Sequence, residues 1–84
     1  MATHPHHLSP ASQLADIKGL LATHFPECEI NGTTTIQVIV TCPSLYTASL
    51  VGLFYIDKGW VVDIKKSNFN QFFFITITLN QVTK

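Results

Sequence analysis

Residues 72–79 read FFFITITL, and this stretch decides the fold because its alternation separates a core face from an outer face. Successive side chains of a strand point to opposite faces of a sheet, so the odd-numbered residues share a purely apolar face. Two threonines share the other face with Phe72 and Phe74. Threonines are common on a solvent-exposed sheet face, whereas two exposed phenylalanines would leave apolar surface in contact with water unless something covers them. We therefore expect a strand over about residues 71–80 whose even-numbered side chains meet another molecule.

The segment before this strand alternates in the same way. Residues 60–66 read WVVDIKK, which places Trp60, Val62 and Ile64 on one face. Residues 67–70 read SNFN, a composition typical of turns. A tight turn joins antiparallel neighbours, so we expect these last two strands to pair with each other.

The first helix is marked by its two ends. Ser9 is suited to cap a helix, and Pro10 is tolerated at the first helical position. Pro26 cannot continue a helix. Between these ends, apolar residues recur at spacings of three and four, which predicts an amphipathic helix of about three turns. These residues are Leu14, Ile17, Leu21 and Phe25.

Residues 28–42 contain two predicted strands separated by Asn31-Gly32, a pair that favours a two-residue hairpin turn. The second strand, TTTIQVIVTC, is rich in β-branched residues. With this turn, Cys42 lies roughly 23 Å along the strand from the residue opposite Cys28. A disulfide requires Cα atoms within about 7 Å, so we expect free thiols.

Residues 45–56 are too apolar for a surface loop and predict a second helix. Ser44 is suited to cap it, and Gly59 can adopt the left-handed conformation that ends helices. Bulky and small residues fall on different sides of this helix: Leu50, Leu53, Phe54 and Asp57 on one, Ala48, Ser49 and Gly52 on the other. A strand over residues 51–56 is the alternative, because β-branched and aromatic residues crowd there.

These elements predict a two-layer α+β fold with the order α-β-β-α-β-β. A helix between strands 33–42 and 60–66 favours a parallel relation between them, and the apolar last strand fits between the two. The result is a split βαβ-like arrangement, in which two helices cover one face of a three- to four-stranded, mainly antiparallel sheet. We expect residues 10–84 to form one domain after a flexible arm, residues 1–9.

Composition narrows the functional classes. Hydrophobic residues make up 46% of the chain and charged residues 12%, about half the usual share of roughly 25%. The formal net charge is zero and arginine is absent, which disfavours binding to nucleic acid. No apolar run reaches the roughly 18 residues of a membrane span, and the start of the chain lacks the features of a signal peptide. We expect a cytoplasmic protein without a cofactor.

The uncovered sheet face is the predicted contact surface. Its apolar residues are Phe72, Phe74, Ile39 and Val61. Apolar patches of this kind usually mark contact sites, and a small, weakly charged domain tends to associate. We expect a non-catalytic module that forms a homo-oligomer, most simply a dimer, or binds another protein through this face. A small apolar ligand held between subunits is another possibility. In the simplest alternative, Phe72 begins the strand and folds over the edge of its own sheet.

The alternative function is thiol chemistry at Cys42. Cys42-Pro43 lies where a strand leads into a helix N-terminus, whose dipole can lower a thiol pKa. The pair resembles the Cys-Pro pair that small sulfur-carrier domains place at such a point, although Leu45 replaces their second proline. This resemblance implies a thiol-dependent carrier or redox protein using Cys42. The alternative is a small buried residue at a strand end.

Histidines suggest a weak metal site near the N-terminus. His4, His6 and His7 lie close together, and imidazole clusters bind zinc, copper or nickel. No carboxylate or cysteine stands at a fixed ligand spacing from them, so a solvated tail is the simpler interpretation. No carboxylate pair, phosphate loop or catalytic triad stands out, and we expect no enzyme activity.

Overall fold

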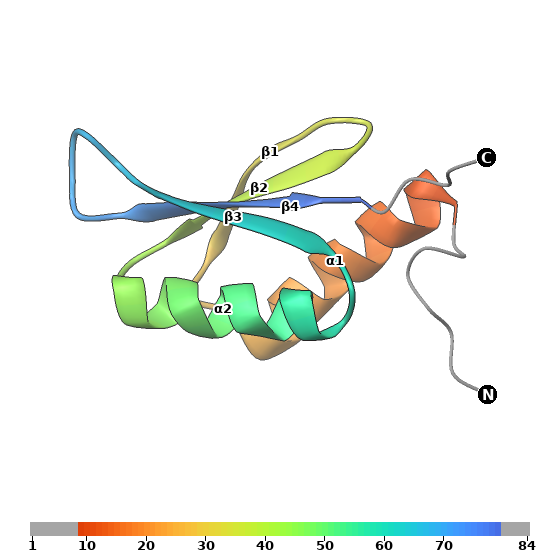
Figure 1. The fold of residues 1–84 in the computed structure, drawn as a ribbon, viewed down its shortest axis with the longest axis horizontal. Coiled ribbons are helices and arrows are strands. Elements are labelled where there is room, and N and C mark those ends of the chain that lie inside the picture. Colours follow the sequence, from red (N-terminus) through yellow and green to blue (C-terminus); the bar gives the residue numbers. More distant parts are fainter. Residues whose placement is uncertain (1–8, 80–84) are drawn as a thin grey trace.

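The computed structural model describes residues 9–79 and contains two helices and four strands. In chain order they are α1 (Pro10–His24), β1 (Glu29–Thr33), β2 (Gln37–Cys42), α2 (Leu45–Asp57), β3 (Val61–Lys66) and β4 (Phe73–Thr78). Figure 1 shows both helices on the same side of the sheet. The predicted two-layer α+β fold and its element order are confirmed.

The sheet has the order β1-β2-β4-β3, and every neighbouring pair is antiparallel. β4 therefore lies between β2 and β3, as predicted from its apolar sequence. Because β2 and β3 are each antiparallel to β4, they run parallel to one another on its two sides.

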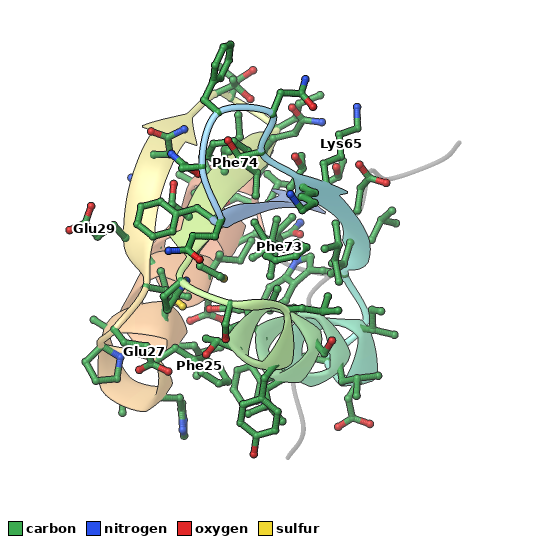
Figure 2. All side chains as sticks on the ribbon, turned by 90° about the vertical axis from the view of Figure 1, so that its left-hand side faces the viewer. Phe25, Glu27, Glu29, Lys65, Phe73 and Phe74 are labelled. Carbon is green, nitrogen blue, oxygen red and sulfur yellow. The ribbon has the colours of Figure 1, made fainter. Side chains whose placement is uncertain are left out.

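The side chains of β4 alternate between the two faces of the sheet as predicted, with the odd-numbered residues toward the helices. Ile75 pairs with Val40 on one side and Ile64 on the other, and this row faces the helices. Ile75 and Val40 are fully buried, whereas Ile64 on the edge strand remains 40% exposed. Figure 2 shows Phe73 on the helix side of β4 and Phe74 on the opposite side.

The predicted helix caps are in place. The side chain of Ser9 accepts a hydrogen bond from the backbone N–H of Ser12, and that of Ser44 accepts one from Thr47. Gly59 follows α2 with a φ of 104°, the left-handed conformation expected of it. Residues 51–56 are helical, so the alternative of a strand there is wrong.

The predicted Asn31-Gly32 turn is wrong. Both residues belong to β1, and the register of β1 against β2 shifts between Ile30 and Gly32. The chain turns instead at residues 34–36, where the hydroxyl of Thr34 accepts hydrogen bonds from the backbone N–H groups of Ile36 and Gln37. A threonine hydroxyl that bonds the backbone two and three residues ahead supplies turn chemistry of its own.

The predicted separation of the two cysteines is also wrong. With the turn moved to residues 34–36, Glu29 pairs with Thr41, and the next position outward brings Cys28 to Cys42. Their Sγ atoms are 3.4 Å apart, and both thiols are free. A shift of the turn by a few residues moves every cross-strand partner, which is why the estimate from the sequence failed.

Buried polar contacts attach α1 to the rest of the core. The Tyr55 hydroxyl donates a 2.6 Å hydrogen bond to the Ile17 carbonyl, and the Trp60 indole N–H donates a 2.8 Å bond to the Gln13 side chain. Tyr55 is fully buried, and Trp60 and Gln13 are nearly so. Each buried donor thereby has a partner, as stability requires.

α2 packs on the sheet through the side that carries Ala48 and Gly52. Its buried residues are Thr47, Ala48, Val51, Gly52 and Tyr55. A Cβ on Gly52 would lie 3.1 Å from Cδ1 of Ile64, so the helix backbone closely approaches β3. This approach turns the bulky side of α2 outward.

Candidate protein-contact surface

The open face of the sheet holds three of the four residues predicted to form an interface. Phe74 lies half-buried between its cross-strand partners Thr41 and Lys65. Figure 2 shows Phe74 and Lys65 on this side of the sheet, away from the helices. The ring of Phe74 is therefore flanked by one hydroxyl and one amine rather than by other apolar residues.

Ile39 and Val61 lie on the same open face but apart from each other. Ile39 pairs with Thr76, and Val61 pairs with Thr78, so threonines of β4 stand between them. Val61 is 61% exposed. The predicted apolar face is consequently interrupted by polar side chains.

Phe72 precedes β4 and has a different environment. It lines a cavity of about 130 Å³ together with Glu27, Glu29, Thr41 and Pro43. Its ring remains 41% exposed. The carbonyl of Phe72 accepts a hydrogen bond from the N–H of Ser67, which closes the turn between β3 and β4.

A larger exposed apolar surface lies on the side of α2 that faces away from the sheet. We call it the α2 outer face and define it by Tyr46, Leu50, Leu53, Ile56 and Asp57. The exposed fractions are 74% for Tyr46, 42% for Leu50, 64% for Leu53 and 52% for Ile56. The sequence pattern distinguishes the two sides of this helix, but the bulky side was not among the predicted contact residues. The available signal was the absence of any charged residue from Leu45 to Ile56.

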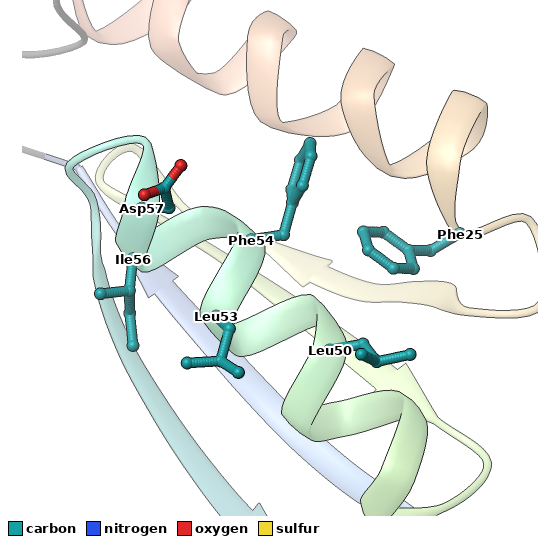
Figure 3. A pocket seen from close by; sticks show the side chains of 6 residues that line it. All are labelled: Phe25, Leu50, Leu53, Phe54, Ile56 and Asp57. Atoms are coloured by element: carbon teal, nitrogen blue, oxygen red, sulfur yellow. The ribbon is translucent and has the colours of Figure 1, made fainter.

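A groove runs along this surface toward α1. It has a volume of about 610 Å³ and is lined by Phe25, Leu50, Leu53, Phe54, Ile56 and Asp57. Figure 3 shows Phe54 pointing from α2 toward α1, with Phe25 beside it. The two rings meet edge to face, with centroids 5.3 Å apart. These aromatic contacts form the wall of the groove on the α1 side.

Lysine, histidine and aspartate side chains border the same groove. The Lys58 amine lies 4.8 Å from the centroid of the Phe54 ring, a cation–π contact, and the His24 ring lies 4.9 Å from the same centroid. Asp57 closes the groove at the C-terminal end of α2. At the other end, the first turn of α2 has no acidic residue, so its positive dipole end lacks a compensating charge.

The spacing among four residues along the α2 outer face is symmetric, so it is the same when counted from either end of the helix. Tyr46, Leu50, Leu53 and Asp57 are separated by four, three and four residues. Residues three and four apart share one side of a helix, so these four form a continuous stripe. If a second copy of α2 lies antiparallel, Leu50 meets Leu53 and Tyr46 meets Asp57, each twice.

Cys42 lies in surroundings that disfavour a thiolate. The side chain is fully buried. Burial, followed by the contact with Cys28, raises the pKa of the Cys42 thiol to about 12. The effect of desolvation on the Cys42 pKa thus outweighs that of the α2 dipole. The low thiol pKa that a sulfur-carrier nucleophile needs is therefore not favoured at this position.

The candidate histidine ligands cannot be placed in the structure. His4, His6 and His7 lie outside the described residues, as does most of the predicted N-terminal arm. Across residues 9–79, no three His, Cys, Asp or Glu side chains gather closely enough to hold a metal ion. In the same part of the chain, neither helix is long and apolar enough to cross a bilayer.

Comparisons of the chain with protein-family models, curated proteins and solved structures find no match. The function is therefore argued from the geometry of the α2 outer face and of the open sheet face.

Proposed function

We propose that this protein is a small non-catalytic module that acts through protein contact, and that it self-associates through the α2 outer face. The observation that carries the proposal is the placement of α2. Thr47, Ala48, Val51, Gly52 and Tyr55 are buried against the rest of the domain, whereas Tyr46, Leu50, Leu53 and Ile56 are exposed to solvent. A helix that is apolar on every side is normally buried on every side.

A second copy of the same chain fits this face better than an unrelated partner does. The stripe of Tyr46, Leu50, Leu53 and Asp57 is symmetric about its centre, which suits the twofold axis of a dimer. In the antiparallel arrangement, each Asp57 approaches the N-terminus of the other α2. The carboxylate there meets the positive end of a helix dipole that has no acidic residue of its own.

Charge and size favour the same conclusion. The chain has zero formal net charge, so two copies do not repel one another over long range. A domain of 84 residues has a small core, and association is a common way to stabilise one. Covering Leu53 and Ile56, each more than half exposed, would remove apolar surface from water on both copies.

The open sheet face is the second candidate for protein contact. Phe74, Ile39 and Val61 are its apolar residues, and Phe72 lies just before β4. The 61% exposure of Val61 and 41% exposure of Phe72 favour this face. Threonines and Lys65 interrupt this surface, whereas the α2 stripe is continuous apart from its ends. We therefore place the self-association on α2 and keep the sheet face as the competing site.

The test compares two sets of surface variants by light scattering after size exclusion at micromolar concentration. Leu53→Lys should convert the dimer to a monomer, because a charge would replace the centre of the stripe. The double variant Phe72→Asp, Phe74→Asp should keep the dimeric mass. Circular dichroism of each variant checks that the fold is retained, which is expected because Leu53 is 64% exposed.

Two outcomes would overturn the proposal. A wild-type protein that remains monomeric throughout the concentration series excludes self-association. A dimer that survives Leu53→Lys but dissociates in the Phe72, Phe74 double variant moves the interface to the open sheet face.

A further inference from the structure

Two buried thiols lie in contact at the edge of the core. The Sγ atoms of Cys28, just before β1, and Cys42, the last residue of β2, are 3.4 Å apart. Cys42 is fully buried and Cys28 is 7% exposed. A disulfide bond has an S–S length of about 2.0 Å, so the sulfurs need to approach by little more than an ångström.

We propose that Cys28 and Cys42 form a dithiol–disulfide couple that a low-molecular-weight disulfide of the glutathione type oxidises. The Cys28 thiolate attacks one sulfur of the oxidant, forming a mixed disulfide and releasing one thiol. The Cys42 thiolate then attacks the Cys28 sulfur and displaces the second thiol. The protein loses two hydrogens and gains one S–S bond, while the oxidant is reduced to two thiols.

The surroundings of the two sulfurs favour Cys28 as the residue that reacts first. It is the only one of the pair with measurable exposure. Burial raises its pKa, but the contact with Cys42 acts in the opposite direction. For Cys42, both burial and the contact with Cys28 raise the pKa. The couple is therefore expected to react slowly near neutral pH and faster as the pH rises.

The bond would connect the two helices. The N–H of Cys28 donates a 3.0 Å hydrogen bond to the carbonyl of Phe25, at the C-terminus of α1. Cys42 lies two residues before Ser44, the N-cap of α2. A Cys28–Cys42 disulfide thus fixes the end of α1, with its groove residue Phe25, to the start of α2. The couple is a redox-dependent clamp at one end of the groove between the helices.

The experiment uses the full chain in glutathione redox buffers, with thiols counted by alkylation after denaturation and the intact mass measured. Oxidation should give a chain lighter by two hydrogens, with both cysteines protected from alkylation. The equilibrium constant for disulfide formation should be about tenfold larger in the folded protein than in the same protein in urea, because folding holds the sulfurs together. Cys28→Ser and Cys42→Ser are the matched controls, and each can form only a mixed or intermolecular disulfide.

Other products would overturn the proposal. A folded protein that accumulates glutathione adducts or disulfide-linked dimers, or that keeps two free thiols after prolonged oxidation at raised pH, does not contain the couple. Repeating the oxidation on Leu53→Lys separates this result from self-association, because the intrachain bond forms within one copy.

Discussion

Gly52 of α2 lies directly against Ile64 of β3: a Cβ on Gly52 would come within 3.1 Å of Ile64 Cδ1 and 3.6 Å of Val62 Cγ1. A larger residue there requires the Ile64 side chain to move by a few tenths of an ångström. The close approach lies on the side of α2 that meets the sheet, opposite the exposed Leu50, Leu53 and Ile56.

Enlarging Gly52 should destabilise the fold. We expect Gly52→Leu to lower the free energy of unfolding by about 2 kcal/mol, because overpacking against Val62 and Ile64 outweighs the gain in helix propensity. Urea denaturation monitored by circular dichroism measures the change. Gly19→Ala in α1 is the matched control, since a Cβ there meets nothing within 4 Å. It should raise stability by about 0.5–1 kcal/mol. Equal changes in the free energy of unfolding for the two substitutions would contradict the close approach of Gly52 to Ile64.

Exchanging the charges at positions 46 and 57 tests the antiparallel register of the proposed dimer. Tyr46→Glu should weaken association about fivefold, because the new carboxylate would face Asp57 of the second copy. Asp57→Lys should weaken it to a similar extent, because the amine would approach a helix N-terminus. The double variant should recover the wild-type dissociation constant, since Glu and Lys then pair between copies. Sedimentation over a concentration series gives the constants.

Both single substitutions improve the charge arrangement within the isolated helix, with an acid in its first turn or a base in its last. Loss of association would therefore not arise from a weakened α2. Additive losses in the double variant would exclude this register.

The protein should lose stability in alkali. Burial raises the pKa of Cys42 from 9.0 to about 12 and raises the pKa of Tyr55 above its ordinary 10.0. Above pH 9.0, the unfolded chain releases protons that the folded protein retains, so the free energy of unfolding falls as the pH rises. Below that pH both states hold these protons, and the contribution is fully present.

Urea denaturation under reducing conditions, at neutral pH and at about pH 10.5, measures this dependence. Cys42→Ala and Tyr55→Phe should each reduce the decrease in the free energy of unfolding between the two pH values. Each variant should also be less stable than the wild type at neutral pH. Glu29 is exposed, and Glu29→Gln serves as a control that leaves the fall unchanged. If the free energy of unfolding decreases as much in both variants as in the wild type, titrating groups other than Cys42 and Tyr55 cause the decrease.

Local patterns predicted much of the fold. The caps Ser9 and Ser44 and the glycine at position 59 mark helix ends through contacts within a few residues. The alternation in β4 assigns Ile75 and Ile77 to the core, since strand geometry fixes the direction of each side chain. The central position of β4 followed from its apolar composition and the short turn before it.

The candidate site was predicted less completely. Phe74, Ile39 and Val61 lie on the open face as expected. The sequence also placed two threonines of the last strand on this face, but only the strand register shows that they stand between Ile39 and Val61. Asn31-Gly32 favours a turn locally, yet pairing with β2 places both residues in a strand. The contact between Cys28 and Cys42 depends on that register and was therefore missed.

The order of the elements, the ends of the two helices and the buried face of β4 could be predicted from the sequence, because these depend on neighbours along the chain. Only the tertiary structure decided which side of α2 faces the sheet and which strand positions stand opposite each other. Those outcomes depend on how closely the α2 backbone at Gly52 can approach the Ile64 side chain, and on where the chain turns between β1 and β2. Neither quantity is contained in the alternation of apolar and polar residues.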